Sequence, residues 1–466
     1  MKKGDITEGI IKHISFPNKC EVVNSDGDVI YTKNGIVGQE VKVRVTKKRH
    51  GVMEGDILEV IKHADNEIVP PSCEHFNECG GCTYQNLSYE DQIALKERQL
   101  REIFEGVLPE GAFSKVWEGV KRSPSQFEYR NKMEFSFGDL YKDGPLSLGM
   151  HKRGSFYDVV PVLNCKIIDE DYRKILHETL MFFRGVNATY FHKVRHEGYL
   201  RHLLVRKAKA TGEILVDLVT TSSMNFESGY ADECAMLNAY KDCLLSLTLD
   251  GKFVSILHTK NDGVADTIND EGTDILYGTD HFFEELLGLR FKISPFSFFQ
   301  TNSLGAEVLY STAREFIGDA IKEGATVYDL YSGTGTIAQV LSPAAGKVIG
   351  VEIVEEAVEA AKVNAKLNGL TNCEFIAGDV LKALDDVPEK PDFIVLDPPR
   401  DGIHPKALEK IIDYNVDRMI YISCKPTSLA RDLKVLQARG YKVSRMCAVD
   451  MFANTFQVET IAFISK

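Results

Sequence analysis

The feature that most constrains the fold of this 466-residue chain is an alternation of short apolar segments with helix-like segments, which begins at Thr326. The interval 355–367 has the clearest helical character. Strand, helix and strand in this order predict a mostly parallel sheet with helices on both faces. The predicted strands are residues 327–331, 347–352, 373–376, 392–397, 418–423 and 457–464.

Polar residues follow four of these strands, at the edge of an open sheet where ligands bind. Gly333 and Gly335 let the backbone approach a ligand, and Glu352 follows where an acid can accept hydrogen bonds from a ribose. Asp379 comes after the third strand, and two prolines fix the backbone just after Asp397. The third glycine of a dinucleotide fingerprint and the Lys-Ser/Thr of a P-loop are missing. S-adenosylmethionine therefore fits these positions better than NAD or ATP.

Cys424 directly follows the fifth predicted strand and precedes Lys425 and Pro426. A lone cysteine there is often a buried structural residue, but a nearby ammonium can lower a thiol pKa, and the thiolate is the nucleophilic form. A methyl donor beside a nucleophilic cysteine fits an acceptor carbon such as carbon 5 of uracil, which becomes nucleophilic when a thiolate adds to carbon 6. A base must then remove the carbon-5 proton. Glu459 is the candidate base; the alternative is an ordinary strand glutamate.

The N-terminal residues 1–63 read as short strands separated by turns, which predicts a small β-barrel. Residues 127–287 alternate strand-like runs with polar turns, which predicts a central, mainly antiparallel α+β domain at residues 70–290. Within it, residues 88–118 can pack on the third domain, residues 291–466. The net charge of −13 disfavours a nucleic-acid partner unless basic residues are concentrated locally. The barrel has such a concentration, although lysines also protect edge strands. Its basic residues are Lys42, Arg44, Lys47, Lys48 and Arg49.

Four further cysteines form a second group of candidate functional residues. Cys73, Cys79 and Cys82 lie close together after the barrel, two glycines precede the third, and Cys165 follows later. Four thiolates fit either zinc or an iron–sulfur cluster, and the spacing alone does not choose between them.

Five ordered motifs together resemble the RNA 5-methyluridine methyltransferases. They are Phe-Gln-Thr-Asn at 299–302, Asp-Leu-Tyr-Ser-Gly-Thr-Gly at 329–335, Asp-Pro-Pro-Arg at 397–400, Ser-Cys-Lys-Pro at 423–426 and Val-Glu-Thr at 458–460. The cysteine pattern and the barrel are similar to the 23S rRNA branch, which has an OB-like TRAM domain and a 4Fe-4S cluster. One departure is Gln457, two residues before the candidate base, where relatives often have His.

The resemblance implies a Rossmann-like S-adenosylmethionine-dependent methyltransferase domain and a central domain with a 4Fe-4S cluster. It implies that Gln300, Tyr331, Glu352 and Asp397 contact the cofactor, with Cys424 as nucleophile and Glu459 as base. It also places several residues of the central domain near the RNA. These are Arg130, Asn131, Lys132, Arg201 and His202, for each of which surface charge is the alternative interpretation.

The predicted activity is methylation of carbon 5 of a single-stranded or loop uridine, most simply in 23S rRNA. Alternatives are the same reaction on tRNA, methylation of an exocyclic amino group, and a non-catalytic iron–sulfur RNA-binding protein. The sequence has no apolar core of signal-peptide length and no uncharged run long enough to cross a membrane. We therefore expect a cytoplasmic protein, and nothing demands more than a monomer.

Overall fold

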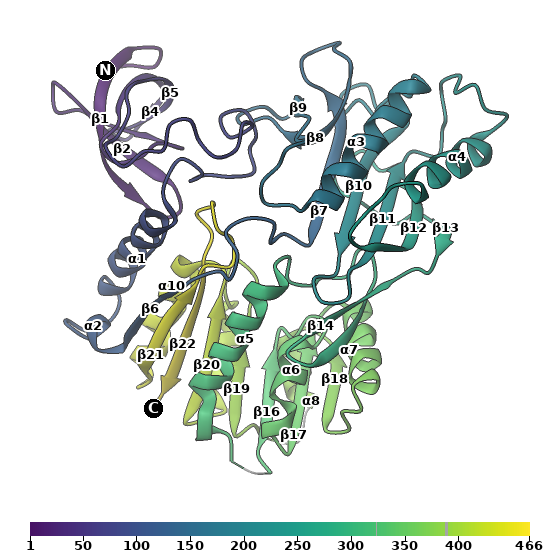
Figure 1. The fold of residues 1–466 in the computed structure, drawn as a ribbon. Helices are drawn as coiled ribbons and strands as arrows, with labels where there is room; N and C mark the ends of the chain where they lie inside the picture. The colour runs from purple at the N-terminus through teal and green to yellow at the C-terminus, as the bar shows by residue number, and fades with distance from the viewer. Residues whose placement is uncertain (323, 387–389) are drawn as a thin grey trace.

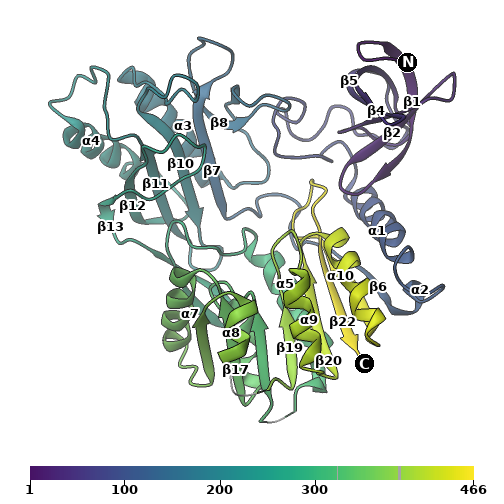
Figure 2. The same cartoon turned by 180° about the vertical axis from the view of Figure 1, so that it is seen from behind.

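The computed structural model describes residues 1–322, 324–386 and 390–466. Figure 1 shows a small N-terminal barrel, a central domain built on a seven-stranded sheet, and a third domain built on an eight-stranded sheet. Seen from behind, the first long helix lies between the barrel and the third domain (Figure 2). The fold of each domain reflects its own pattern of apolar residues along the sequence.

The barrel closes in the order β1-β2-β3-β5-β4. Along β4 the side chains of Val41, Val43 and Val45 are buried, whereas Lys42 and Arg44 point to the other side. This period of two is what a strand with one face on a core requires. The strands are β1 (Ile6–Ser15), β2 (Lys19–Asn24), β3 (Val29–Thr32), β4 (Glu40–Arg49) and β5 (Val52–Lys62).

A connecting segment joins the barrel to the third domain. Helix α1 (Tyr89–Glu105) begins where the Ser88 side chain accepts a hydrogen bond from the Asp91 N–H, which satisfies one free donor of the first turn. After α2 (Phe113–Val116), strand β6 (Trp117–Lys121) pairs in parallel with the last-but-one strand of the chain. Strand β6 was not predicted from the sequence, because its five residues lack a clear apolar alternation.

The central sheet has the order β13-β12-β11-β10-β7-β8-β9, and all its neighbours are antiparallel except β11 and β12. Its helices α3 and α4 pack together over the same core. The elements are β7 (Lys132–Asp139), β8 (Leu146–His151), β9 (Val159–Val160), α3 (Glu170–Gly185), β10 (Leu200–Lys207), β11 (Glu213–Thr220), α4 (Glu233–Leu245), β12 (Lys252–Lys260) and β13 (Thr273–Gly278). A hairpin of β14 (Phe282–Leu286) and β15 (Leu289–Ile293) leads to the third domain.

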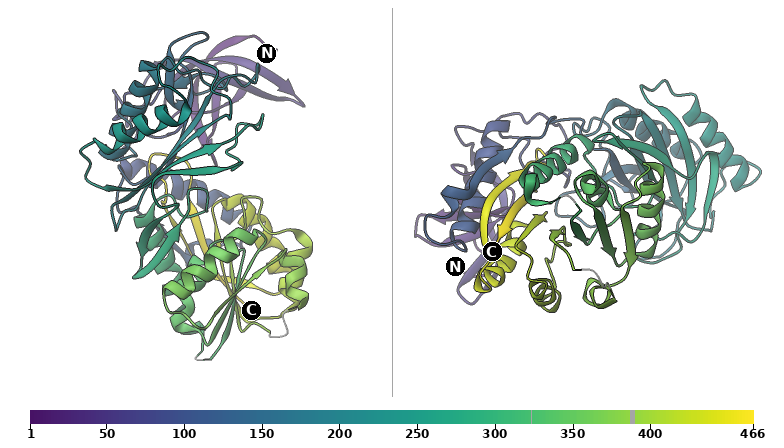
Figure 3. Two further views of the ribbon diagram at one scale, coloured as in Figure 1. Left: turned by 90° about the vertical axis from the view of Figure 1, so that its right-hand side faces the viewer. Right: turned by 90° about the horizontal axis from the view of Figure 1, so that it is seen from below.

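The third domain has the sheet order β18-β17-β16-β19-β20-β22-β21-β6. The first five of these strands are parallel, and β22 is antiparallel to both neighbours. Helices α5, α6 and α7 pack on one face, while α1, α8, α9 and α10 pack on the other. Figure 3 shows green helices on both sides of this sheet. The predicted doubly covered parallel sheet is confirmed.

The bounds of this domain's elements are α5 (Ser303–Ile317), η1 (Gly318–Ala320), β16 (Thr326–Leu330), α6 (Thr336–Leu341), η2 (Ser342–Ala344), β17 (Lys347–Glu352), α7 (Glu355–Leu367), β18 (Cys373–Ala377), α8 (Val380–Asp386), β19 (Phe393–Leu396), α9 (Pro405–Asp413), β20 (Arg418–Ser423), α10 (Pro426–Ala438), β21 (Lys442–Val449) and β22 (Glu459–Ser465). Among the helices of the described residues, none is long and apolar enough to cross a membrane.

Candidate active site

The site lies where the parallel strands of the third domain end. The carboxyl ends of β16 to β20 lie at one edge of the sheet because these strands are parallel and in register. The glycine loop follows β16, Glu352 ends β17, and Asp397 and Cys424 follow β19 and β20. Residues far apart in the sequence therefore reach one crevice.

The glycine loop has positive φ angles, a backbone conformation that disfavours residues other than glycine. Tyr331, Gly333 and Gly335 have φ angles of 68°, 53° and 73°. A Cβ on Gly335 would lie 2.6 Å from the ring of Phe375, whereas a Cβ on Gly333 would meet nothing within 4 Å. Gly335 is thus required for packing, while Gly333 leaves open space for a ligand to approach the backbone.

Glu352 is oriented by the loop that it faces. Its two carboxylate oxygens accept hydrogen bonds from the N–H groups of Gly333 and Val354, each at 3.0 Å. Asp379 is exposed, and its side chain accepts from the N–H of Leu381 at the start of α8. Burial raises the pKa of the Tyr331 hydroxyl to about 12, and the charge of Asp379 adds to this shift. The predicted cofactor residues of three successive strands are therefore neighbours.

Two carboxyl groups with raised pKa values meet beside the cysteine. Burial raises the pKa of Glu459 to about 8, the negative charge of Asp397 adds to the shift, and Arg400 opposes it. Burial likewise raises the pKa of Asp397 to about 7. Glu459 is only 5% exposed. A carboxylate with a pKa near neutrality is a stronger base than a free glutamate and is still ionised in part at pH 7.

Cys424 is half-buried beside this carboxyl pair. Burial raises its thiol pKa to about 11, the charges of Glu459 and Asp397 add to the shift, and a hydrogen bond and the charge of Arg400 lower it. The expectation of a lowered thiol pKa is wrong, because burial and the neighbouring carboxylates outweigh the cation beside the thiol. The Lys425 ammonium lies 4.0 Å from the exposed carboxylate of Asp401. Arg400 is the cation that acts on the thiol. Without a bound substrate the cysteine is therefore mainly protonated at neutral pH.

The loop that carries Gln300 is fixed by the central domain. The Asn131 side chain donates hydrogen bonds to the Gln300 carbonyl at 3.0 Å and to the Ser303 hydroxyl at 2.8 Å. The Gln300 side chain hydrogen-bonds to Tyr310, whose hydroxyl pKa is raised by burial and by the charges of Asp397 and Glu459. Gln300 thereby belongs to the same cluster as the carboxyl pair.

Three residues of this cluster were not predicted as site residues, namely Arg400, Tyr310 and Asp329. Asp329 is fully buried at the end of β16, and one of its oxygens accepts from the Ala338 N–H at 2.9 Å. Burial raises its pKa to about 8, and the nearby Asp397 charge adds to the shift. An acid at the end of an apolar strand was a visible signal for Asp329, whereas Tyr310 lies within a helix and gives no such signal.

The four predicted metal ligands gather near one another in the central domain. Burial raises the thiol pKa of Cys82 to about 12 and that of Cys165 to about 11, and charge on other cysteines of the set adds to both shifts. The Gly81 N–H donates to the Cys79 sulfur at 3.3 Å. Within the described parts of the chain, no group of three or more His, Cys, Asp or Glu side chains is arranged to hold a metal ion. The four thiols, which include Cys73, are the type of ligand that an iron–sulfur cluster requires. In the described residues their side chains are not arranged as a complete metal site.

The predicted RNA contacts of the barrel are accessible. Arg44, Lys47, Lys48 and Arg49 lie on β4 with exposed or half-exposed side chains, and Lys42 is half-buried. Lys47 pairs with Glu54 at 3.4 Å, and the Lys48 ammonium donates to the Met1 carbonyl at 2.8 Å. These are exposed contacts that a phosphate can replace at little cost.

The central-domain candidates divide into two kinds. Arg201 is 4% exposed and donates to the carbonyls of Asn261, Gly263 and Ala265, so it holds a loop inside the protein. His202 is also buried, and burial lowers its pKa to about 4. The structure corrects the interpretation of both as RNA contacts, because neither presents charge to solvent.

The remaining central-domain candidates for RNA contacts, Arg130, Asn131 and Lys132, lie at or next to a surface cleft. Arg130 and Asn131 line a polar cleft of about 300 Å³ together with Lys207 and Lys209. The Lys132 ammonium pairs with Glu134 at 2.8 Å. The cleft thus borders the Asn131 contacts that fix the Gln300 loop.

Comparison with known proteins relates this geometry to a family. The family model for tRNA (uracil-5-)-methyltransferase matches residues 288–466. An uncharacterized RNA methyltransferase of Clostridium tetani is 47% identical over 100% of this chain and 99% of its own length. A second one, of Caldanaerobacter subterraneus subsp. tengcongensis, is 47% identical over the whole of both chains.

The chain belongs to the RNA uracil-5-methyltransferase family. The matched residues 288–466 contain the glycine loop, the carboxyl pair and Cys424 of this methyltransferase, but neither the barrel nor the four clustered cysteines. A solved structure of Pyrococcus abyssi tRNA (uracil-54, C5)-methyltransferase in complex with S-adenosyl-L-homocysteine has the same fold. It covers 98% of this chain and 99% of its own, with a TM-score of 0.75 at 24% identity. The barrel and the central domain are therefore included in the similarity.

Proposed function

We propose that this methyltransferase transfers the methyl group of S-adenosylmethionine to carbon 5 of a uridine in RNA. The observation that carries the proposal is the convergence of Cys424, Asp397 and Glu459 at the strand ends beside the glycine loop. The family membership, and the complex of the Pyrococcus abyssi enzyme with S-adenosyl-L-homocysteine, support the choice of cofactor.

The cofactor residues have distinct tasks in this proposal. When bound, S-adenosylmethionine supplies an electrophilic methyl group. Two backbone N–H groups hold the Glu352 carboxylate, which keeps further lone pairs free to accept hydrogen bonds from ribose hydroxyls. Gly333 leaves space for the cofactor to approach the backbone. The remaining proposed contacts are Gln300, Tyr331, Gly335, Asp379 and Asp397, all at or beside the strand ends.

The reaction needs two functions from side chains. Cys424 adds to ring carbon 6 as a thiolate, and Arg400 favours that thiolate because it lowers the thiol pKa. After carbon 5 has been methylated, Glu459 takes the carbon-5 proton, carbons 5 and 6 regain their double bond, and the cysteine leaves. The raised pKa of about 8 gives Glu459 the basicity that this step requires.

The proposed RNA surface consists of the barrel residues Lys42, Arg44, Lys47, Lys48 and Arg49, together with Arg130 and Asn131 at the cleft and Lys132, the next residue along the chain. A local basic track can bind phosphates although the whole chain is acidic. The target uridine must leave its stack to reach Cys424, at a cost of a few kcal/mol that a single-stranded loop reduces.

Ribosomal RNA is the proposed substrate, since the barrel, read as a TRAM domain, and the cysteines resemble the 23S rRNA branch. Transfer RNA is the second candidate, because a tRNA (uracil-54, C5)-methyltransferase covers 98% of this chain. The presence of a barrel therefore does not by itself favour ribosomal RNA.

The proposal includes a 4Fe-4S cluster held by Cys73, Cys79, Cys82 and Cys165. It would crosslink the segment after the barrel to the central domain, and methyl transfer requires no electrons from it. Anaerobic purification followed by iron and sulfide analysis tests this, with an expected stoichiometry of about four irons per chain. Loss of iron in Cys82→Ser but not in Cys234→Ser would support the assignment, and an iron-free wild type would contradict it.

Covalent trapping tests the reaction. The protein is incubated with S-adenosylmethionine and RNA containing 5-fluorouridine, in ribosomal and transfer RNA fragments, and an SDS-stable adduct is sought by mass spectrometry. Fluorine cannot leave as a proton, so the adduct should accumulate in wild type and in Cys447→Ala, but not in Cys424→Ala. Methyl transfer to ordinary RNA by Cys424→Ala would refute the mechanism and favour a nitrogen acceptor.

A further inference from the structure

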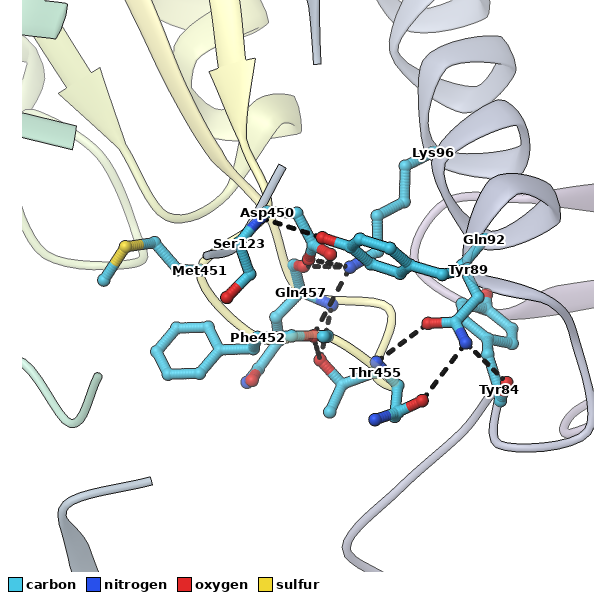
Figure 4. A network of polar contacts seen from close by, with 12 residues as sticks. Tyr84, Tyr89, Gln92, Lys96, Ser123, Asp450, Met451, Phe452, Thr455 and Gln457 are labelled. Carbon is cyan, nitrogen blue, oxygen red and sulfur yellow. Dashed lines mark hydrogen bonds and ion pairs between the residues drawn. The ribbon is translucent and has the colours of Figure 1, made fainter. Parts of the chain in front are cut away.

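The loop of residues 450–458 connects β21 to β22 and leads directly into Glu459. The Lys96 ammonium, from helix α1, donates to the Asp450 carboxylate at 2.5 Å, to the Gln457 carbonyl at 2.8 Å and to the Phe452 carbonyl at 3.4 Å. Figure 4 shows the lysine reaching from the helix into this loop. One cation therefore binds both ends of the 450–458 loop.

The Lys96–Asp450 pair is wholly buried, since both side chains have 0% exposure. Burial lowers the pKa of Lys96, and the charge and hydrogen bond of Asp450 oppose that shift. A buried ammonium is tolerated only when its donors are satisfied, and these three acceptors of Lys96 all belong to the loop. The loop conformation and the lysine position are thus mutually dependent.

Other parts of the chain hold the middle of the same loop. The Gln92 side chain exchanges hydrogen bonds with Asn454, and the N–H groups of Thr83 and Tyr84 donate to the Asn454 carbonyl. The Tyr129 hydroxyl donates to the Ala453 carbonyl at 2.9 Å. Helix α1, the segment after Cys82 and the central domain therefore meet on this loop.

The loop is coupled to Glu459 through the sheet. Val449, immediately before Asp450, is the cross-strand partner of Glu459, which lies two residues after Gln457. A shift of either loop end would move the first residue of β22, and with it the buried carboxyl group. Gln457 takes part through its backbone carbonyl, so this contact does not depend on the side chain at that position.

We infer that Lys96 and Asp450 are positioning residues that hold the general base Glu459 in place through the 450–458 loop. The inference rests on the proposed function. It assigns a role in the third domain to a helix that precedes that domain by almost two hundred residues in the sequence. The competing explanation is that the pair only stabilises the fold.

The two explanations differ in the step that fails. Addition of Cys424 and methyl transfer precede proton removal, so they do not need a correctly placed Glu459. When the base is displaced, the C–H bond at carbon 5 does not break, the double bond is not restored, and the bond from carbon 6 to sulfur persists. A positioning defect therefore leaves a methylated, covalent protein–RNA complex on ordinary RNA.

The experiment compares wild type with Lys96→Met, with Asp450→Asn, and with the double variant Lys96→Met/Asp450→Leu, which leaves no unpaired buried charge. Arg445→Met is the matched control, because Arg445 lies on β21, the strand that leads into the 450–458 loop, and the change breaks its ion pairs to Glu118 and Glu315. Each protein receives S-adenosylmethionine and ordinary RNA, and SDS-stable complex, methylated product and cofactor affinity are measured.

We expect kcat to fall about 10- to 100-fold in the folded variants, as a displacement of about 1 Å can cause. The covalent complex should accumulate, cofactor affinity should stay within about twofold, and Arg445→Met should release product like wild type. If the double variant folds and turns over like wild type, or if no variant accumulates the complex, the inference is overturned. Failure of the wild type to form an adduct with 5-fluorouridine RNA would instead refute the proposed function, and the base assignment with it.

Discussion

Replacing the candidate base should make the protein more stable while it abolishes product release. Burial and the neighbouring Asp397 charge raise the pKa of Glu459 from 4.5 to about 8. At about 1.4 kcal/mol per pKa unit, ionised Glu459 costs the folded state roughly 5 kcal/mol relative to its neutral form. Glutamine has nearly the same shape and carries no charge. Glu459→Gln should therefore remove most of this cost.

The stability gain of Glu459→Gln depends on pH, and its direction follows from the raised pKa of Glu459. Below about pH 4.5, Glu459 is protonated in both the folded and the unfolded chain, so glutamine offers no advantage. Between pH 4.5 and about 8, the unfolded chain loses this proton while the folded protein keeps it, so wild-type stability falls as the pH rises. The advantage of Glu459→Gln should accordingly grow across this window and level off above pH 8.

Urea unfolding at pH 5, 7 and 9, followed by tyrosine fluorescence and circular dichroism, measures the difference. Glu67→Gln is the matched control with the opposite sign: although burial opposes it, hydrogen bonds from Gln39 and Asn86 hold the pKa of Glu67 below its usual value. That variant should lose stability by a similar amount at all three pH values, because the stabilisation from a lowered carboxyl pKa is lost only when the pH falls below the usual glutamate pKa of 4.5. A gain for Glu459→Gln that is equal at all three pH values, or a loss that grows with pH, would refute the reasoning.

Three further predictions concern the cofactor loop and the thiol. Asn131→Ala removes two hydrogen bonds that fix the Gln300 loop, and calorimetry should show about tenfold weaker S-adenosylmethionine binding, as expected for about 1.4 kcal/mol; unchanged affinity would contradict this. Gly335→Ala places a methyl group 2.6 Å from the Phe375 ring at a positive φ, so it should lower Tm and abolish cofactor binding, which thermal shift with and without cofactor detects. Arg400→Met removes the cation that lowers the thiol pKa of Cys424, so alkylation of this cysteine by iodoacetamide at pH 8 should slow severalfold; an equal or faster rate would refute the role of Arg400.

Much of the third domain could be predicted from local pattern. Each strand is a short apolar run, and parallel strands end at the same edge, so the positions after the runs locate Glu352, Asp397 and Cys424 without coordinates. The N-terminal strands were likewise visible, because alternating valines and lysines in β4 reflect a period of two.

By itself the sequence thus determined the parallel sheet, the barrel and the residue types at the strand ends, since these depend on neighbours a few positions apart. The tertiary structure alone decided the environment of those residues. It raised the pKa of Cys424 through burial and the charges of Glu459 and Asp397, buried Arg201 and His202, and brought Lys96 to Asp450 across 354 positions. The reason is physical: desolvation and charge act through space, so a pKa or a buried ion pair depends on contacts that no local pattern contains.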